Sequence, residues 1–139
     1  MTEVEIAAEN GRTLRVSHVR AGDDEGWTYS VHLDTETARG GIGVFDYGDP
    51  GLPSFFSDLA ARWRGFEGTR ELESLEGQLH ISAEHDGRGT VRCLVTIGQA
   101  WPPAWSLQAE LDLGAGAHLE AIASDLASAF AEAGARRSR

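Results

Sequence analysis

The 139-residue sequence contains a single cysteine, Cys93, and no lysine. One cysteine excludes an internal disulfide and a cysteine-rich zinc site, so packing must hold the fold together. No apolar run approaches the roughly 20 residues that a membrane-spanning helix needs. The first residues, MTEVEIAAEN, lack the basic start and the apolar centre of a signal peptide. We therefore expect a cytoplasmic protein.

Basic residues are scarce: 12 of them, all arginine, stand against 22 acidic residues, which gives a net charge of −10. Such a field repels nucleic acid and anionic membranes and attracts a basic protein, although solubility alone is an alternative explanation. Hydrophobic content of 41% and charged content of 24% are typical of a folded soluble protein. We expect one domain over residues 1–134 and a disordered arginine-rich tail over 135–139, with the oligomeric state left open.

Alternating apolar residues predict four strands in the first half of the chain. The first two form a hairpin around residues 9–11, with Gly11 in a left-handed conformation, which places Val4 opposite Val16 and Glu5 opposite Arg15. Two more strands follow, at residues 27–33 and about 39–46. A helix then begins near Pro53 and ends before Gly65. Its apolar stripe contains Phe55, Phe56, Leu59, Ala60 and Trp63.

The second half of the chain repeats this order. A short strand is an option between Gly68 and Gly77, and strands are predicted around 79–85, 91–97 and 107–113. A final helix runs from about residue 116 to 133, with Gly134 at its end. We therefore predict an α+β fold in two layers: a largely antiparallel sheet of about seven strands, covered by two helices, in the order ββββα then βββα.

The stretch HISAEHDGRGTVRCLVTI at residues 80–97 contains the residue types of a hydrolase site. A three-residue loop at 87–89 instead makes it a hairpin, with Glu84 opposite Arg92 and His85 opposite Val91. Strand alternation puts Ser82, Glu84 and Asp86 on one face and His85 on the other, which excludes a Ser-His-Asp relay. We expect no catalytic residues, no metal site and no cofactor, because phosphate-loop and zinc motifs are also absent from the sequence.

Two sets of residues remain as candidates for function. The first is a partner surface made of Glu67, Glu71, Glu73 and Glu76 together with Trp101 and Trp105. These two tryptophans either fold back on the core or stay exposed as interface anchors. The second is a pocket between sheet and helices, lined by Trp27, Tyr29, Trp63 and His85. Within its hairpin, only His85 remains a candidate for function, because a side chain at this inward position can border such a pocket.

The blocks FFSDLAARWRGFEG and SLEGQLHISAEHDGRGTV, with the closing strand and helix, resemble an uncharacterised family of small actinobacterial proteins over residues 53–131. No catalytic residues can be carried over from this family. More distantly, the layout is similar to Wap-type immunity proteins, small acidic antidotes that neutralise contact-delivered toxins by binding them. We therefore expect a non-enzymatic module that binds a basic protein, as such an antidote does. The alternatives are a small-molecule binder or enzyme with a pocket beneath the helices, and an oligomerisation module that uses an edge strand.

Overall fold

The computed structural model describes residues 3–99, 101–102 and 104–137. In this part of the chain, four strands and a helix are followed by four more strands and a second helix. The elements are β1 (Val4–Ala7), β2 (Thr13–Ala21), β3 (Gly26–Asp34), β4 (Arg39–Tyr47), α1 (Gly51–Ala61), β5 (Thr69–Glu73), β6 (Leu79–His85), β7 (Thr90–Gln99), β8 (Trp105–Gly114) and α2 (Ala117–Arg137). The predicted α+β class, antiparallel pairing and element order are confirmed, and β5 is the optional short strand.

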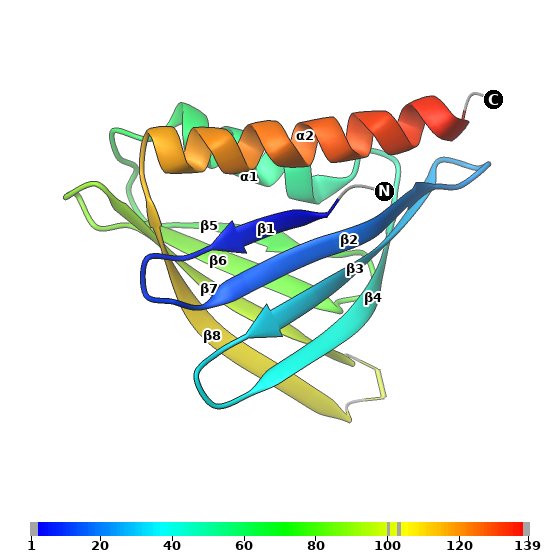
Figure 1. Cartoon of the computed structure of the whole chain (residues 1–139), viewed down its shortest axis with the longest axis horizontal. Helices are drawn as coiled ribbons and strands as arrows, with labels where there is room; N and C mark the ends of the chain where they lie inside the picture. The colour runs from blue at the N-terminus through cyan, green and yellow to red at the C-terminus, as the bar shows by residue number, and fades with distance from the viewer. Residues whose placement is uncertain (1–2, 100, 103, 138–139) are drawn as a thin grey trace.

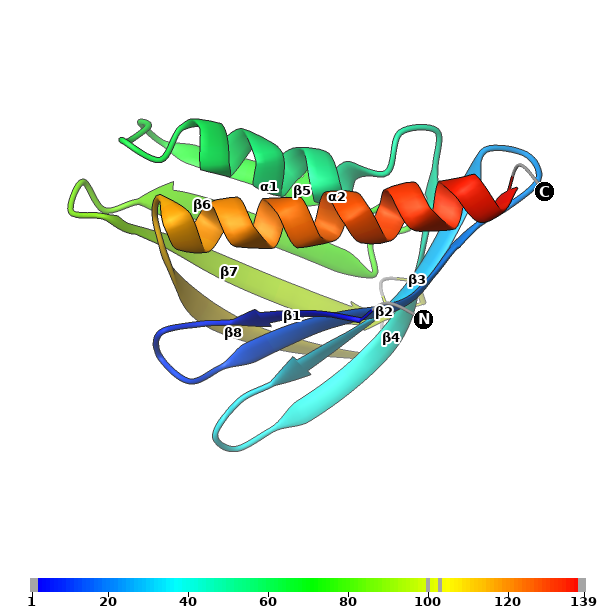
Figure 2. The same ribbon diagram turned by 45° about the horizontal axis from the view of Figure 1, so that its top comes forward.

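The strands form two separate antiparallel sheets, which we call the N-terminal sheet (β1-β2-β3-β4) and the C-terminal sheet (β5-β6-β7-β8). This division was not anticipated. Figure 1 shows the N-terminal sheet in front of the C-terminal sheet, with β4 approaching β7, and α2 running across the top. In Figure 2, α1 and α2 lie side by side on the same side of the sheets. No helix among the described residues is long and apolar enough to cross a membrane.

Both predicted hairpins have the expected register. Val4 pairs with Val16 in the first hairpin, and His85 pairs with Val91 in the second. Gly11 and Gly89 close the two loops with φ angles of +87° and +91°, a conformation that is strained for other residues. The register follows from the alternation of apolar residues, because a slip by one residue would turn a strand's buried side chains toward water.

One continuous cluster of buried residues joins the inner faces of the two sheets to the helices. Its largest fully buried side chains are Phe56, Ile6, Leu14, Leu33, Leu52, Leu59, Leu79, Ile81, Ile97, Leu111, Leu113 and Leu119. Each such side chain contributes about 1.5–3 kcal/mol when it leaves water. Cys93 belongs to this cluster, and burial raises the pKa of its thiol to about 12, so it is a packing residue rather than a nucleophile.

The first helix ends before Gly65, as predicted, but two other details of the helices differ from the prediction. Helix α1 ends at Ala61, and Trp63 lies beyond it with 47% of its surface exposed, so Trp63 is not part of the apolar stripe. Helix α2 continues through Gly134 to Arg137. Arg137 holds this last turn in place, because its guanidinium lies over the Trp27 ring at 4.9 Å and donates to the Gly26 carbonyl. The predicted disordered tail is therefore wrong for residues 135–137, while 138 and 139 lie outside the described residues.

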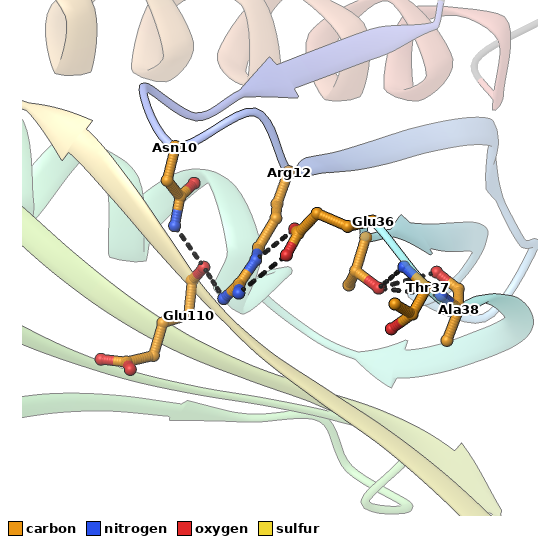
Figure 3. A network of polar contacts seen from close by, with 7 residues as sticks. Asn10, Arg12, Glu36, Thr37, Ala38 and Glu110 are labelled. Carbon is orange, nitrogen blue, oxygen red and sulfur yellow. Dashed lines mark hydrogen bonds and ion pairs between the residues drawn. The ribbon is translucent and has the colours of Figure 1, made fainter.

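The free edge of β8 is covered by the loop between β1 and β2. The Glu9 amide donates to the Asp112 carbonyl at 2.8 Å, and the Asn10 side chain donates to the Glu110 carbonyl at 2.9 Å. The Arg12 guanidinium also donates to the Glu110 carbonyl and forms an ion pair with Glu36, at 2.8 Å, next to the β3–β4 turn (Figure 3). These contacts satisfy backbone acceptors that an edge strand otherwise exposes.

Candidate partner-binding groove

The polar residues of the second hairpin have structural roles. The Asp86 carboxylate accepts hydrogen bonds from the amides of Arg88 and Thr90, which lower its pKa. His85 accepts a hydrogen bond from the Gly87 amide through Nδ1, which leaves Nε2 to donate to the Trp63 carbonyl at 2.8 Å. These bonds tie the hairpin to the loop that follows α1 and use both ring nitrogens of His85.

The arginines of the two predicted cross-strand charge pairs form ion pairs with other acidic residues. Arg92 lies opposite Glu84, as predicted, but its guanidinium binds Asp112 of β8 at 3.1 Å. Arg15 likewise lies opposite Glu5 and reaches Asp34 of β3 at 3.5 Å. Each arginine is on a strand with a neighbour on both sides, and pairwise register does not decide which neighbour its side chain reaches.

The structure places the four residues of the predicted pocket beneath the helices in two groups. Trp27 and Tyr29 pack against the Phe130 ring of α2, with centroid separations of 5.6 and 5.5 Å. Trp63 is exposed after α1, and His85 is engaged at the end of β6. None of the depressions found on the described residues brings these four side chains together.

The residues of the predicted partner surface are all exposed. Trp101 is 85% exposed and Trp105 is 42% exposed, so the choice between burial and exposure is decided in favour of exposure. Glu71 and Glu73 project from β5, Glu67 precedes this strand, and Glu76 lies in the turn that follows it. The structure brings only Glu76 and Trp101 of this set into one depression.

This depression, which we call the β4 groove, has a volume of about 480 Å³. It is lined by Ile42, Gly43, Glu76, Gln78, Gln99 and Trp101. A second depression of about 400 Å³ continues past Gly43, Glu76 and Gln78 toward His18 and Arg20 on β2. The two depressions share Gly43, Glu76 and Gln78, and they extend from an aromatic and acidic end at Trp101 to a basic end at Arg20.

A buried aspartate holds the acidic turn beside β4. Asp46, which is 7% exposed, accepts hydrogen bonds from the Leu75 amide at 3.0 Å and the Tyr29 hydroxyl at 3.2 Å. Burial and the nearby Asp46 charge raise the pKa of Tyr29, which keeps its proton on the donor. The turn is closed by Ser74, whose hydroxyl accepts from the Leu79 amide at 3.1 Å. Glu76 is thus positioned by a rigid turn rather than by a free loop.

The tryptophan side of the groove is fixed by the ends of β7 and β8. The Gly98 amide donates to the Gln78 carbonyl at 3.0 Å, and the Gln99 side chain donates to the Pro102 carbonyl at 2.8 Å. A Cβ atom on Gly98 would collide with the Trp105 carbonyl oxygen and lie 2.8 Å from the Ser106 Cα. The close approach of the two strands therefore requires glycine at position 98.

Sequence reasoning identified Glu76 and Trp101 but missed Ile42, Gly43, Gln78 and Gln99 as groove residues. The available signal was Gly43, because a glycine inside a strand often marks a close approach of another backbone. Among the described residues that line the groove, Glu76 is the one with a titratable side chain. No cluster of three or more histidine, cysteine or acidic side chains able to hold a metal ion occurs among the described residues.

The fold defines an α+β protein made of two antiparallel four-stranded meanders, each followed by a helix. The model of one family, described as "Family of unknown function (DUF6228)", matches residues 5–133. The chain therefore belongs to this family, and the match extends well beyond the region in which the sequence blocks carry the resemblance. Comparisons with curated proteins and with solved structures give no match.

Proposed function

We propose that this protein is a non-enzymatic module that binds a basic protein partner through the β4 groove and the neighbouring acidic strand β5. The observation that supports this most directly is Trp101, which is 85% exposed next to Glu76 in a chain of net charge −10. An exposed tryptophan beside a hollow is the type of anchor that contributes strongly to protein interfaces. An acidic field increases the association rate with a basic protein.

We further propose that the partner is a basic toxin and that the protein acts as its antidote in the cytoplasm. The acidic surface supports this proposal, since toxins that act on nucleic acid are commonly basic and are steered by negative charge. A single buried cysteine is compatible with a reducing compartment. Binding alone would neutralise such a toxin, so no catalytic group is needed.

The test uses the full chain as bait in extracts of cells that encode it, at about 50 mM and about 500 mM salt, because screening weakens exposed charge pairs. A triple variant, Glu71→Gln, Glu73→Gln and Glu76→Gln, removes three charges from β5 and from the turn that borders the groove. A matched variant, Glu3→Gln, Glu120→Gln and Asp125→Asn, removes three charges elsewhere. Retained proteins are identified by mass spectrometry, purified and titrated against each bait.

We expect a basic protein that binds wild type and the matched variant at low salt and binds the groove variant at least about tenfold more weakly, as the loss of several favourable charge contacts predicts. The proposal is wrong if no purified basic protein binds, or if both triple variants weaken binding equally. Equal weakening would mean that overall charge, and not this surface, governs association.

A further inference from the structure

We propose that the partner contributes an extended segment that pairs with the free edge of β4 as an added strand. A lysine or arginine side chain of that segment lies against Trp101 and Glu76. This inference rests on the proposed function and specifies the chemistry by which the partner is recognised. Strand addition uses main-chain hydrogen bonds for affinity and side-chain contacts for specificity.

Some backbone groups of β4 at the groove are not paired by any strand of the described residues. Strand β4 is the outer strand of the N-terminal sheet, and β3 is its one partner within the described part of the chain. Hydrogen-bonded and non-hydrogen-bonded residues alternate along the β3–β4 pair. Two bonds fix this alternation: the Gly48 amide donates to the Glu25 carbonyl, and the Thr35 amide donates to the Ala38 carbonyl. Even-numbered residues of β4 therefore bond to β3, while Gly41, Gly43 and Phe45 direct their amides and carbonyls to the free edge.

Gly43 is a glycine that the fold itself does not require. A Cβ atom at this position would have no neighbour within 4 Å, and its φ angle is outside the left-handed region. Every other glycine of the chain either has a positive φ angle or lies against a neighbouring atom. Because glycine inside a strand costs stability, its presence at an open edge is explained by something that approaches from outside.

Gly41 shows how such a space is used within the molecule. The ring of His32, from the neighbouring strand β3, lies over Gly41 so closely that a Cβ atom would collide with it. Gly43 offers the same kind of space on the exposed face with nothing above it. A side chain from an added strand can cover Gly43 as His32 covers Gly41, in the way that cross-strand neighbours fill the space over a glycine.

The chemistry of the hollow selects the occupant. At one end, the exposed Trp101 ring and the Glu76 carboxylate favour a cation, which an aromatic face and an acid both attract. At the other end, His18 and Arg20 disfavour one. Gln78 and Gln99 also line the groove, and their side-chain amides donate within the chain, to the Glu76 carboxylate at 3.1 Å and to the Pro102 carbonyl at 2.8 Å. The preferred segment is therefore extended and has its basic residue at the Trp101 end.

The test is a titration of the 15N-labelled full chain with capped hexapeptides, followed by NMR. The first peptide alternates threonine and arginine, the second has the same sequence with alternate backbone nitrogens methylated, and the third has glutamate in place of arginine. We expect the first peptide to shift the amide signals of Gly41, Gly43 and Phe45 and the indole signal of Trp101. Methylation removes the backbone donors and should weaken binding about tenfold or more, and the glutamate peptide should not bind.

Variants of the chain separate the backbone contacts from the side-chain contacts. Gly43→Pro removes the amide that faces the free edge, a change that an edge strand tolerates, and should weaken the arginine peptide about tenfold. Gly43→Ala keeps the amide and fills the open space, so a loss of only about threefold is expected. Trp101→Ala should weaken the peptide about tenfold, while Trp63→Ala, a change at another exposed tryptophan, should have no effect.

The results distinguish this inference from the proposed function. The inference is overturned if the arginine peptide shifts no signal at residues 41–45, or if the methylated peptide binds as well as the unmethylated one. It is also overturned if a purified basic partner binds Gly43→Pro and wild type equally, in which case the proposed function stands without it. Peptide binding as expected, with no basic protein retained by the full chain, overturns the proposed function and supports strand addition.

Discussion

The outer strands β4 and β8 occupy equivalent places, since each is the last strand of a four-stranded meander and each precedes a helix. Their free edges nevertheless differ. The chain covers β8 with three donors from the β1–β2 region, provided by Glu9, Asn10 and Arg12. At β4, the edge borders the groove at Ile42 and Gly43, and the nearest turn is held beside the edge by Asp46.

This difference shows that the fold has the means to close an edge and uses them selectively. An open strand edge exposes unpaired amides and carbonyls and promotes unwanted association. The cost at β4 is limited because a glutamate and two glutamines line the groove beside it. An edge that is open and polar is suited to one defined partner rather than to general aggregation.

The largest expected effect on stability comes from Gly98→Ala. This variant tests whether glycine is required where β7 lies against β8. The added methyl group collides with backbone atoms of Trp105 and Ser106, which cannot move without shifting β8. We expect a loss of about 3 kcal/mol in the free energy of unfolding, the upper part of the range for overpacking. Urea unfolding at constant pH provides the measurement. A loss below about 1 kcal/mol would contradict the requirement for glycine at position 98.

A comparison of strand register with ion pairing shows which features can be predicted from the sequence and which cannot. The hairpin registers could be predicted because they depend on local alternation and on Gly11 and Gly89 within the loops themselves. The ion pair of Arg92 could not be predicted, since it depends on β8, a third strand whose position pairwise register leaves undefined. The division of the eight strands into two sheets could not be predicted either, because it depends on the arrangement of the whole chain.

The groove was predictable only in part for the same reason. Glu76 and Trp101 were recognised by residue type, because acids and tryptophans are informative wherever they are exposed. Ile42 and Gln99 have no such signal in their residue type and belong to different sheets, so only the three-dimensional arrangement brings them together. The predicted pocket is not decided by the sequence, because alternation identifies which side chains face inward but not whether packing leaves a space among them.

An intermediate effect is expected when the covered edge is opened. The double variant Asn10→Ala and Arg12→Ala removes two side-chain donors from the Glu110 carbonyl. Cys93 reports on this opening, because it pairs with Leu111 on β8 and its buried thiol has a raised pKa. We expect thiol labelling under native conditions to become about fivefold faster, the change that corresponds to about 1 kcal/mol of local stability.

The control for this measurement is Arg88→Ala, which removes an exposed arginine from the β6–β7 loop without touching the β8 edge. Its labelling rate should equal that of wild type. If the double variant also labels at the wild-type rate, the contacts in Figure 3 do not restrain β8, and the distinction between a covered and an open edge loses its energetic basis.

The smallest effect, and the one of opposite sign, is expected for Gly43→Ala. The methyl group meets no atom, and alanine restricts the unfolded chain more than glycine does, so the free energy of unfolding should rise by about 0.4–1 kcal/mol. Gly41→Ala is the matched control, because the same change there forces the His32 ring to move and should give no such gain. Urea unfolding of both variants gives the comparison.

If Gly43→Ala destabilises the protein as Gly98→Ala does, then the fold requires this glycine, and the open edge of β4 needs no partner to explain it. A gain in stability together with weaker peptide binding would instead mean that the chain gives up stability at position 43 to keep space for a partner strand.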